Sequence, residues 1–344
     1  MTVTRKAFAL SGAMLLAVFC AAYWAGERYA ARDWLPWFRA SKGTLAEVVE
    51  IDNQARTDFD LQTLRLTDDR GLGVTVKAKT PVACELPRPA ILTLGGVNSG
   101  GRVAADLPRT GCFVVVSIDY PYDGRRRGLS AWEVATRWPA MRKALLDTVP
   151  ATMLAVDYLY QRGDIDRNRI VLVGGSLGAL IAPAAAAADE RIDAVAVLFG
   201  AGDIEQLVLA NLQIRAPLQR PLAWLANIVL SPLEPLKYIG RVAPRPVLLI
   251  NGTGDARMPE ALGRELQNRA KEPKTTLWYD IGHASIRSTD FRGLVINAFA
   301  DWLVEESILS DQHASEIRFA EDTPADDSAR DESTDQVFHV QEKR

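Results

Sequence analysis

Short apolar segments alternate with amphipathic ones along the middle of the chain. The apolar segments are rich in β-branched residues and end in turn residues, which predicts buried strands. They lie at 90–96, 112–121, 169–175, 192–200, 245–255 and 275–283. Helical spacing predicts helices at 151–162, from residue 177 onward and at 293–307. Because strands and helices alternate, we expect a mainly parallel sheet covered by helices on both faces.

Two further segments extend this plan. Residues 63–68 and 72–80 resemble a pair of strands joined by a turn. The interval between strands 192–200 and 245–255 is longer than one crossover helix requires. Within it, residues 203–243 are apolar and punctuated by proline. We interpret 203–243 either as a small helical cap near the functional face or as a longer crossover.

The N-terminal end has a different pattern. Arg5 and Lys6 precede residues 7–24, which carry no charge. This order is typical of a signal anchor or of a cleaved signal peptide over residues 1–26, with Ala22 as a cleavage point. The expected partner of this segment is a membrane. Either interpretation places the main domain outside the cytoplasm, periplasmic or extracellular, as a membrane-anchored or a secreted protein. Residues 27–55 are expected to be a linker.

Residues 309–344 form an acidic tail. From Ser310 onward there are ten acidic and four basic residues and few apolar ones, which predicts a disordered extension. The net charge of the whole chain is −3, so nothing in it suggests nucleic-acid binding. The sequence contains no His-Glu-x-x-His or Cys-x-x-Cys cluster, and neither a metal nor an organic cofactor is expected.

A Gly-x-Ser-x-Gly motif links the strand at 169–175 to the following helix. Its members are Gly174, Ser176 and Gly178. In a sharp strand-to-helix turn of this kind the serine is exposed as a nucleophile, and the glycines let neighbouring backbone pass close by. An ordinary tight turn made of small residues is the alternative interpretation.

A serine hydroxyl needs a base, and histidine is the usual one. His313 and His339 lie in the acidic tail, which leaves His283, directly after the last predicted strand. The base in turn needs a carboxylate to orient it. Asp255, at the end of the preceding strand, is our candidate, and Asp203 is a weaker one from the strand before that.

An oxyanion hole requires backbone N–H groups beside the nucleophile. The amide of Leu177, which follows Ser176, is one expected donor. The glycine-rich loop at 95–101 would supply the second, from Val97 or alternatively from Asn98. A phosphate-binding loop is the competing interpretation of these glycines, but the loop lacks the Lys-Ser/Thr ending of that motif.

With these residues the chain resembles the α/β-hydrolase superfamily, and within it the dienelactone hydrolase and acyl-thioesterase-like branch. The matching segments are RNRIVLVGGSLGA, RPVLLINGTGDARMP and IGHAS, and the resemblance covers residues 56–308. It implies a mostly parallel eight-stranded sheet whose second strand is antiparallel. The usual His-Gly of the oxyanion loop is Gly95-Gly96 here, which weakens the choice of donor.

The implied fold sets residues 72–80 antiparallel beside 112–121, and this brings Cys84 towards Cys112. We therefore expect a disulfide between them, consistent with export, with two unpaired buried thiols as the alternative. Arg125, Arg126 and Arg127 follow the strand at 112–121. They are expected to form a solvated loop, or alternatively to attract an anionic substrate or lipid headgroups.

Together these features predict a serine hydrolase that cleaves small-molecule carboxylic esters or thioesters through an acyl-enzyme intermediate. Ser176, Asp255 and His283 would form its catalytic triad. Two alternatives stay open: a serine peptidase, and a hydrolase-like fold that binds a ligand without catalysis.

Overall fold

One sheet organises the domain in the computed structural model, which describes residues 2–97, 99–124, 130–212, 214–284, 288 and 291–319. Within these residues the sheet has nine strands in the order β1-β2-β3-β5-β4-β6-β7-β8-β9. Their bounds are β1 Leu45–Ala55, β2 Phe59–Asp68, β3 Gly73–Pro81, β4 Arg88–Leu94, β5 Val114–Ile118, β6 Ile165–Gly175, β7 Ala194–Leu198, β8 Val247–Gly252 and β9 Lys274–Tyr279.

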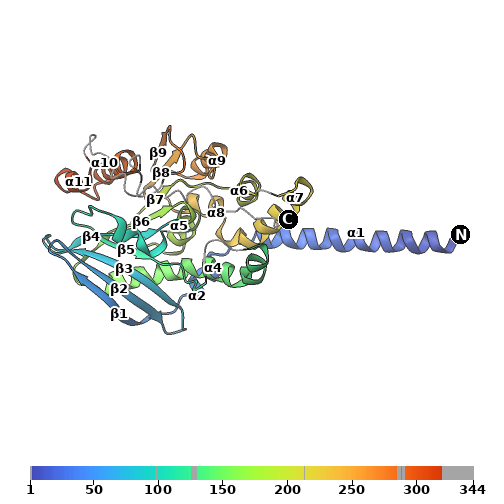
Figure 1. Cartoon of the computed structure of the whole chain (residues 1–344), viewed down its shortest axis with the longest axis horizontal. Coiled ribbons are helices and arrows are strands. Elements are labelled where there is room, and N and C mark those ends of the chain that lie inside the picture. The colour runs from blue at the N-terminus through green and yellow to red at the C-terminus, as the bar shows by residue number, and fades with distance from the viewer. Residues whose placement is uncertain are drawn as a thin grey trace.

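The strand directions agree with the expected fold class. From β5 to β9 every neighbouring pair is parallel, and β1, β2 and β3 form an antiparallel meander (Figure 1). Strand β3 pairs antiparallel with β5, with Val76 opposite Ile118. The prediction of a mainly parallel sheet with an antiparallel strand beside 112–121 is therefore confirmed.

The count of eight strands is too low by one, because β1 lies in the segment expected to be a linker. Of its eleven residues only Leu45 is buried, since β1 is an edge strand whose outer side faces solvent. An edge strand with this exposure has no alternation of buried and polar positions, and it is therefore missed in a search for hydrophobic periodicity.

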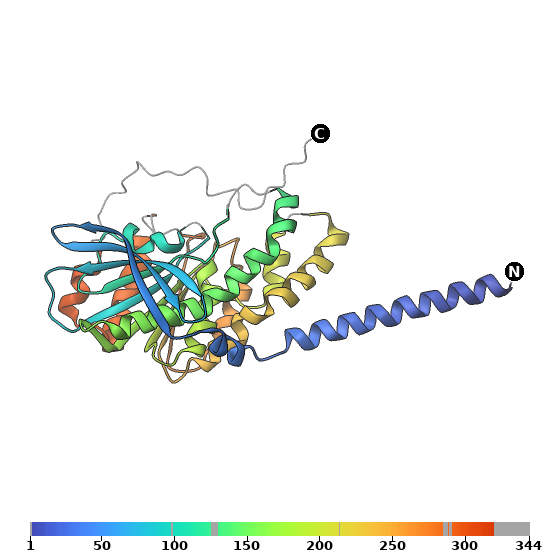
Figure 2. The ribbon, with the colours of Figure 1, turned by 90° about the horizontal axis from the view of Figure 1, so that it is seen from below.

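Helices cover both faces of the sheet, as Figures 1 and 2 show. The helices are α1 Thr2–Ala30, α2 Leu35–Ser41, α3 Val103–Asp106, α4 Ala131–Gln161, α5 Leu177–Ala188, α6 Ile204–Asn211, α7 Ala216–Leu230, α8 Pro235–Tyr238, α9 Glu260–Arg269, α10 Asn297–Glu305 and α11 Asp311–Ile317, with a π-helical turn at Phe291–Ile296 before α10. On one face α2, α4, α5 and α8 enclose a core with the sheet. On the other face α3, α10 and α11 enclose a second core.

The insertion at 203–243 folds into α6, α7 and α8. The Asn211 side-chain amide donates to the Arg257 carbonyl oxygen over 2.9 Å, and Leu207 packs against Met258. Helix α6 therefore lies against the loop that follows β8. Helix α7 projects beside the first half of α4 (Figure 2), where the Arg142 guanidinium donates to the Val229 carbonyl oxygen.

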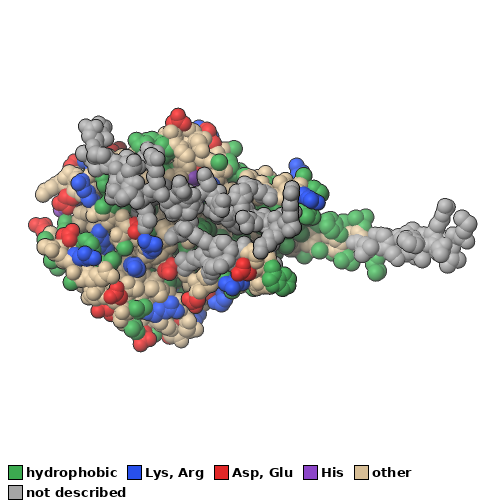
Figure 3. Space-filling model, viewed as in Figure 1, with side chains coloured by type: hydrophobic (Ala, Val, Ile, Leu, Met, Phe, Trp, Pro, Cys, Tyr) green, Lys and Arg blue, Asp and Glu red, His purple; other side chains and the backbone are tan. Residues whose placement is uncertain are grey.

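Helix α1 leaves the domain as a separate rod, and hydrophobic side chains coat the part nearest the domain (Figure 3). Its end is docked on α7: the rings of Tyr23 and Trp224 stack at 5.5 Å, and the Trp224 indole N–H donates to Glu27. The sequence predicted a signal anchor or a signal peptide here. Among the residues that the structure describes, no helix combines the length and the apolar character that crossing a membrane requires.

The start of the acidic tail is ordered, in contrast to the prediction of disorder from residue 309. The Ser310 hydroxyl oxygen accepts from the His313 N–H and caps α11, whose Ala314 and Ile317 are buried in the second core. Two apolar residues one turn apart are too few to give a recognisable helical pattern among acidic neighbours, so the sequence did not predict this helix. Residues 320–344 and the arginines at 125–127 lie outside the described residues.

A disulfide joins Cys84, in the loop after β3, to Cys112, just before β5. The two Cα atoms are 5.6 Å apart, within the range that a disulfide spans. The antiparallel pairing of β3 with β5 brings these two loops together at one end of the strands.

Candidate active site

Ser176 occupies the sharp turn between β6 and α5. Its backbone has φ 55° and ψ −112°, a conformation that residues other than glycine rarely adopt. The turn is held because the Ser176 N–H donates to the Leu198 carbonyl oxygen and the Ser176 carbonyl oxygen accepts from Ala179. Strained backbone in a turn fixed from both sides is typical of functional sites.

The two motif glycines are required by close backbone approaches. A Cβ on Gly178 would lie 1.9 Å from the carbonyl oxygen of Leu94 in β4. A Cβ on Gly174 would lie 2.5 Å from the Gly178 carbonyl oxygen. A Cβ on Gly175 would meet nothing within 4 Å. The spacing of the motif therefore reflects how tightly the first turn of α5 packs against β4 and β6.

Asp255 and His283 come from loops that are tied to each other. Strands β8 and β9 are parallel neighbours, so the loops after them leave from the same edge of the sheet. The Thr253 N–H donates to the Tyr279 carbonyl oxygen over 2.9 Å, and the Gly254 N–H donates to the Ile281 carbonyl oxygen over 3.1 Å. These bonds hold Asp255 and His283 side by side, at the same edge of the sheet where Ser176 follows β6.

The three predicted residues form a continuous hydrogen-bonded chain. The His283 Nε2 atom is 2.9 Å from the Ser176 Oγ atom, and the His283 Nδ1 atom is 2.7 Å from an Asp255 carboxylate oxygen. The Asp255 side chain is fully buried, and its other oxygen accepts from the N–H groups of Arg257 and Met258. A buried carboxylate fixed in this way holds the imidazole in the tautomer that accepts a proton at Nε2.

The other carboxylates near this edge have different roles. The carboxylate of Asp203, the weaker candidate, accepts a hydrogen bond from the Gln206 N–H and caps the start of α6. The Asp280 carboxylate accepts from the Thr253 hydroxyl and so ties the two loops together.

The loop after β4 lies against the nucleophile. A Cβ on Gly96 would be 3.5 Å from the Ser176 Cβ, and the Gly95 carbonyl oxygen accepts a hydrogen bond from the Tyr120 hydroxyl. Leu177 is the first residue of α5, where the N–H groups lack intrahelical partners. No hydrogen bond within the described part of the chain uses the Val97 N–H. Asn98, the alternative donor, lies outside the described residues.

Phe199 is a site residue that the sequence analysis missed. It follows β7 with φ 52°, it is 2% exposed, and its ring centroid lies 5.5 Å from that of His283. It also stacks on Phe291. Phe199 therefore forms an apolar wall against which the imidazole rests. In the sequence it only extends an apolar strand, which gives no sign of this role.

Within the described residues, no group of three or more His, Cys, Asp or Glu side chains is arranged to hold a metal ion.

Comparison with known proteins bears on the fold and on the family. A profile of the prolyl oligopeptidase family matches residues 140–308. The structure is similar to an acetyl xylan esterase from Paenibacillus sp. R4, with TM-score 0.59 and 17% identity over 80% of this chain and 92% of that one. It is also similar to acetyl xylan esterase 1 from Thermoanaerobacterium sp. JW/SL YS485, with TM-score 0.56 and 18% identity over 82% and 92% of the two chains.

A methylesterase aligns as well, with TM-score 0.56 and 21% identity over 86% of this chain and 65% of that one. Among curated protein sequences, none matches the chain. These similarities are consistent with the branch that the motifs indicated, and at such identities they show the fold. By its sheet order, its nucleophile turn and these similarities, the chain has the α/β-hydrolase fold.

Proposed function

We propose that the protein is a serine hydrolase that cleaves carboxylic esters through an acyl-enzyme intermediate. The observation that carries this proposal is the unbroken chain from Asp255 through His283 to Ser176, with contacts of 2.7 and 2.9 Å. Esterases among the similar folds support the choice of substrate, and thioesters undergo the same chemistry.

In the proposed first half-reaction, His283 Nε2 accepts the proton of the Ser176 hydroxyl as Oγ attacks the ester carbonyl carbon. The negative charge that develops on the carbonyl oxygen is stabilised by the N–H groups of Leu177 and Val97. The tetrahedral intermediate collapses, the alkoxide takes the proton from His283 and leaves, and the acyl group stays on Ser176.

In the second half-reaction a water molecule loses a proton to His283 Nε2 and attacks the acyl carbon. The Ser176 oxygen leaves and recovers its proton, and the carboxylic acid is released. Asp255 stays ionised throughout and stabilises the imidazolium. The apolar contact with Phe199 limits how far the ring can swing between these steps.

A fluorophosphonate probe, which phosphonylates activated serines, tests this proposal. We expect wild-type protein to be labelled, Ser176→Ala not to be labelled, and Ser41→Ala, at a half-buried serine at the end of α2, to be labelled like wild type. Absence of labelling in folded wild-type protein would refute the proposal.

A serine peptidase is the second candidate, because the matching profile describes the prolyl oligopeptidase family. A panel of 4-nitrophenyl esters, acyl thioesters and 4-nitroanilide peptides separates the two. Ester hydrolysis with kcat/KM at least about a hundredfold above that for every peptide supports the esterase, and the reverse order supports the peptidase.

We also propose that the domain functions outside the cytoplasm. The disulfide between Cys84 and Cys112 supports this, because such bonds persist in oxidising compartments. Fractionation of cells that produce the full chain tests the proposal, and recovery of the folded protein only with the cytoplasmic contents would contradict it.

A further inference from the structure

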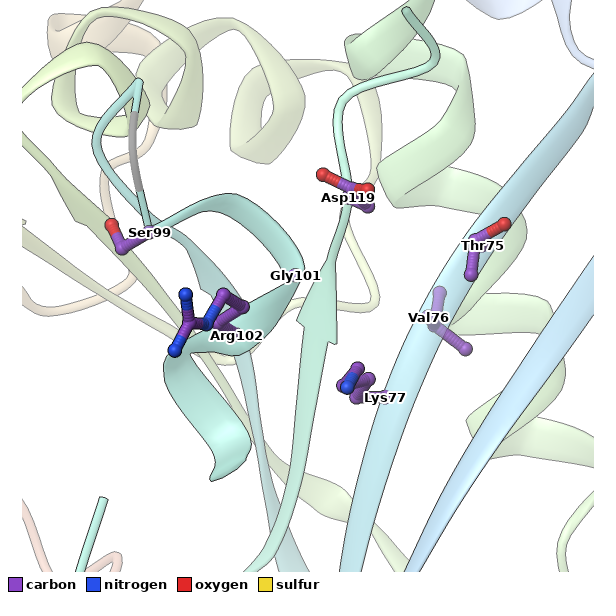
Figure 4. A pocket seen from close by; sticks show the side chains of 7 residues that line it. All are labelled: Thr75, Val76, Lys77, Ser99, Gly101, Arg102 and Asp119. Atoms are coloured by element: carbon purple, nitrogen blue, oxygen red, sulfur yellow. The ribbon is translucent and has the colours of Figure 1, made fainter. Parts of the chain in front are cut away.

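A cavity lies beside the loop that faces Ser176. It has a volume of about 140 Å³ and opens between β3, the end of β5 and the loop after β4 (Figure 4). We call it the basic side pocket. Its lining residues are Thr75, Val76, Lys77, Ser99, Gly101, Arg102 and Asp119.

The topology sets this pocket at the functional edge of the sheet. Because β3 runs antiparallel to β5, its residues Val76 and Lys77 pair with Ile118 and Ser117, near the end of β5. Asp119 directly follows β5, and its N–H donates to the Thr75 carbonyl oxygen. Gly101 closes the wall, since a Cβ there would lie 2.9 Å from the Asp119 Cβ.

One turn of chain separates the pocket from the nucleophile. The Ser99 N–H donates to the Gly96 carbonyl oxygen over 3.1 Å, which closes a tight turn. The Cα atoms at the two ends of such a turn lie within about 7 Å of each other. Gly96 faces Ser176, whereas Ser99 lines the pocket. A group bound in the pocket would therefore lie on the order of 10 Å from the reacting carbonyl.

The charges in the pocket favour an anion. Lys77 is half-buried, and within the described part of the chain its ammonium makes no hydrogen bond and no ion pair. The Arg102 guanidinium lies 3.9 Å from the Asp106 carboxylate, and its side chain is 63% exposed, so it is free to reorient towards a ligand. Among the lining residues themselves, Lys77 and Arg102 are basic and Asp119 is acidic, and the Asp106 carboxylate beside Arg102 lies outside the lining.

We propose that the basic side pocket binds a carboxylate at the far end of the ester substrate, through Lys77 and Arg102. A carboxylate places one negative charge against Lys77 and Arg102, whereas a phosphate dianion would place two there, close to Asp119 and Asp106. This inference rests on the proposed ester hydrolysis and names its substrate class: esters that carry a free carboxylate several bonds from the reacting carbonyl, on the acyl or on the alcohol side.

Two matched pairs of substrates test the inference on the full chain. On the acyl side, mono-4-nitrophenyl suberate is compared with 4-nitrophenyl octanoate. On the alcohol side, 8-acetoxyoctanoate is compared with octyl acetate. The measured quantity is the ratio of kcat/KM for the anionic ester to that for its neutral partner. We expect a ratio well above one for at least one pair in the wild type, which falls as ionic strength rises.

The Lys77→Gln and Arg102→Gln variants should each lower that ratio by about tenfold, because each removes a charge-assisted hydrogen bond. The control is Lys271→Gln, an exposed lysine after α9, and it should keep the wild-type ratio. Arg102 is exposed, so its variant tests the inference even if Lys77→Gln fails to fold. A ratio that is equal in wild type, in both variants and in the control would overturn the inference.

Direct binding separates this inference from the proposed function. The Ser176→Ala protein should bind monomethyl suberate in calorimetric titration, and the added Lys77→Gln substitution should weaken that binding. If the wild type hydrolyses no ester, the proposed function fails, and this titration still decides the pocket. Absence of a Lys77-dependent effect, or tighter binding of inorganic phosphate than of monomethyl suberate, would refute the carboxylate assignment.

Discussion

The close contact between Gly178 and β4 predicts a severe effect of a single added methyl group. In Gly178→Ala the new Cβ would sit 1.9 Å from the Leu94 carbonyl oxygen, where ordinary contact begins at 3.4 Å. The two backbones would have to separate by about 1.5 Å. Leu94 is 1% exposed in a central strand, and Gly178 is buried in α5, so neither side can yield by a rotamer change.

Overpacking of a buried contact costs about 1–3 kcal/mol. We expect the upper end, about 3 kcal/mol, because both clashing groups are backbone or fixed to it. For a chain of 344 residues the unfolding entropy is roughly 0.7 kcal/mol/K, so the Tm should fall by about 4 °C. Differential scanning calorimetry measures this, and Gly175→Ala, which meets nothing within 4 Å, is the control and should shift the Tm by less than about 1 °C.

The same displacement should also reduce the catalytic rate. Moving the start of α5 shifts the Leu177 N–H relative to the loop after β4, and a displacement of about 1 Å at a reacting centre costs about a hundredfold in rate. We therefore expect a similar loss of kcat for ester hydrolysis in Gly178→Ala. Equal melting temperatures for Gly178→Ala and Gly175→Ala would refute the reasoning from backbone contact.

Three further predictions concern the carboxylate, the disulfide and one half-buried lysine. Asp255→Asn should lower kcat about 10⁴-fold at an unchanged Tm, because the amide favours the wrong imidazole tautomer, whereas Asp203→Asn should keep most activity; equal losses in stopped-flow assays would contradict this assignment. Replacing Cys84 and Cys112 by serine should destabilise the protein by about 3.5 kcal/mol in urea unfolding, given the 28-residue separation that the bond closes, and no change would mean that the bond does not constrain the unfolded chain. Burial lowers the pKa of Lys237 to about 8, from 10.5 when exposed, so the unfolded chain holds more protons between these values and stability should rise with pH there. We expect a gain of about 1 kcal/mol after allowing for partial exposure, absent in Lys237→Met, and a pH-independent difference between the two proteins in urea unfolding would disprove it.

The arrangement of the candidate site was largely predictable from the sequence. Ser176, Asp255 and His283 each lie within four residues of the end of a strand, and the ends of parallel strands meet at one edge of a sheet. Their chain order matched the superfamily, and His283 was the one histidine outside the acidic tail. These signals are local, so no contact had to be known in advance.

Features that depend on tertiary packing were not predictable in this way. Strand β1 is held by pairing with β2, and Glu47, Glu50 and Asp52 interrupt its apolar residues, so its pattern resembled that of a linker. The positive φ of Phe199 arises where the chain turns after β7, and nothing in an apolar run marks it. The contact of Gly96 with Ser176 joins loops eighty residues apart in the sequence.

The docking of α1 on α7 bears on how the protein would mature. The docking contacts come from Tyr23, Gly26 and Glu27, which all lie after Ala22, and they converge on Trp224 and its neighbour Ile228. Processing after Ala22 would remove the apolar segment and leave every one of these contacts in place. A processed chain and an intact precursor would therefore share one folded domain, with the stacked Tyr23 and Trp224 at the new N-terminal end.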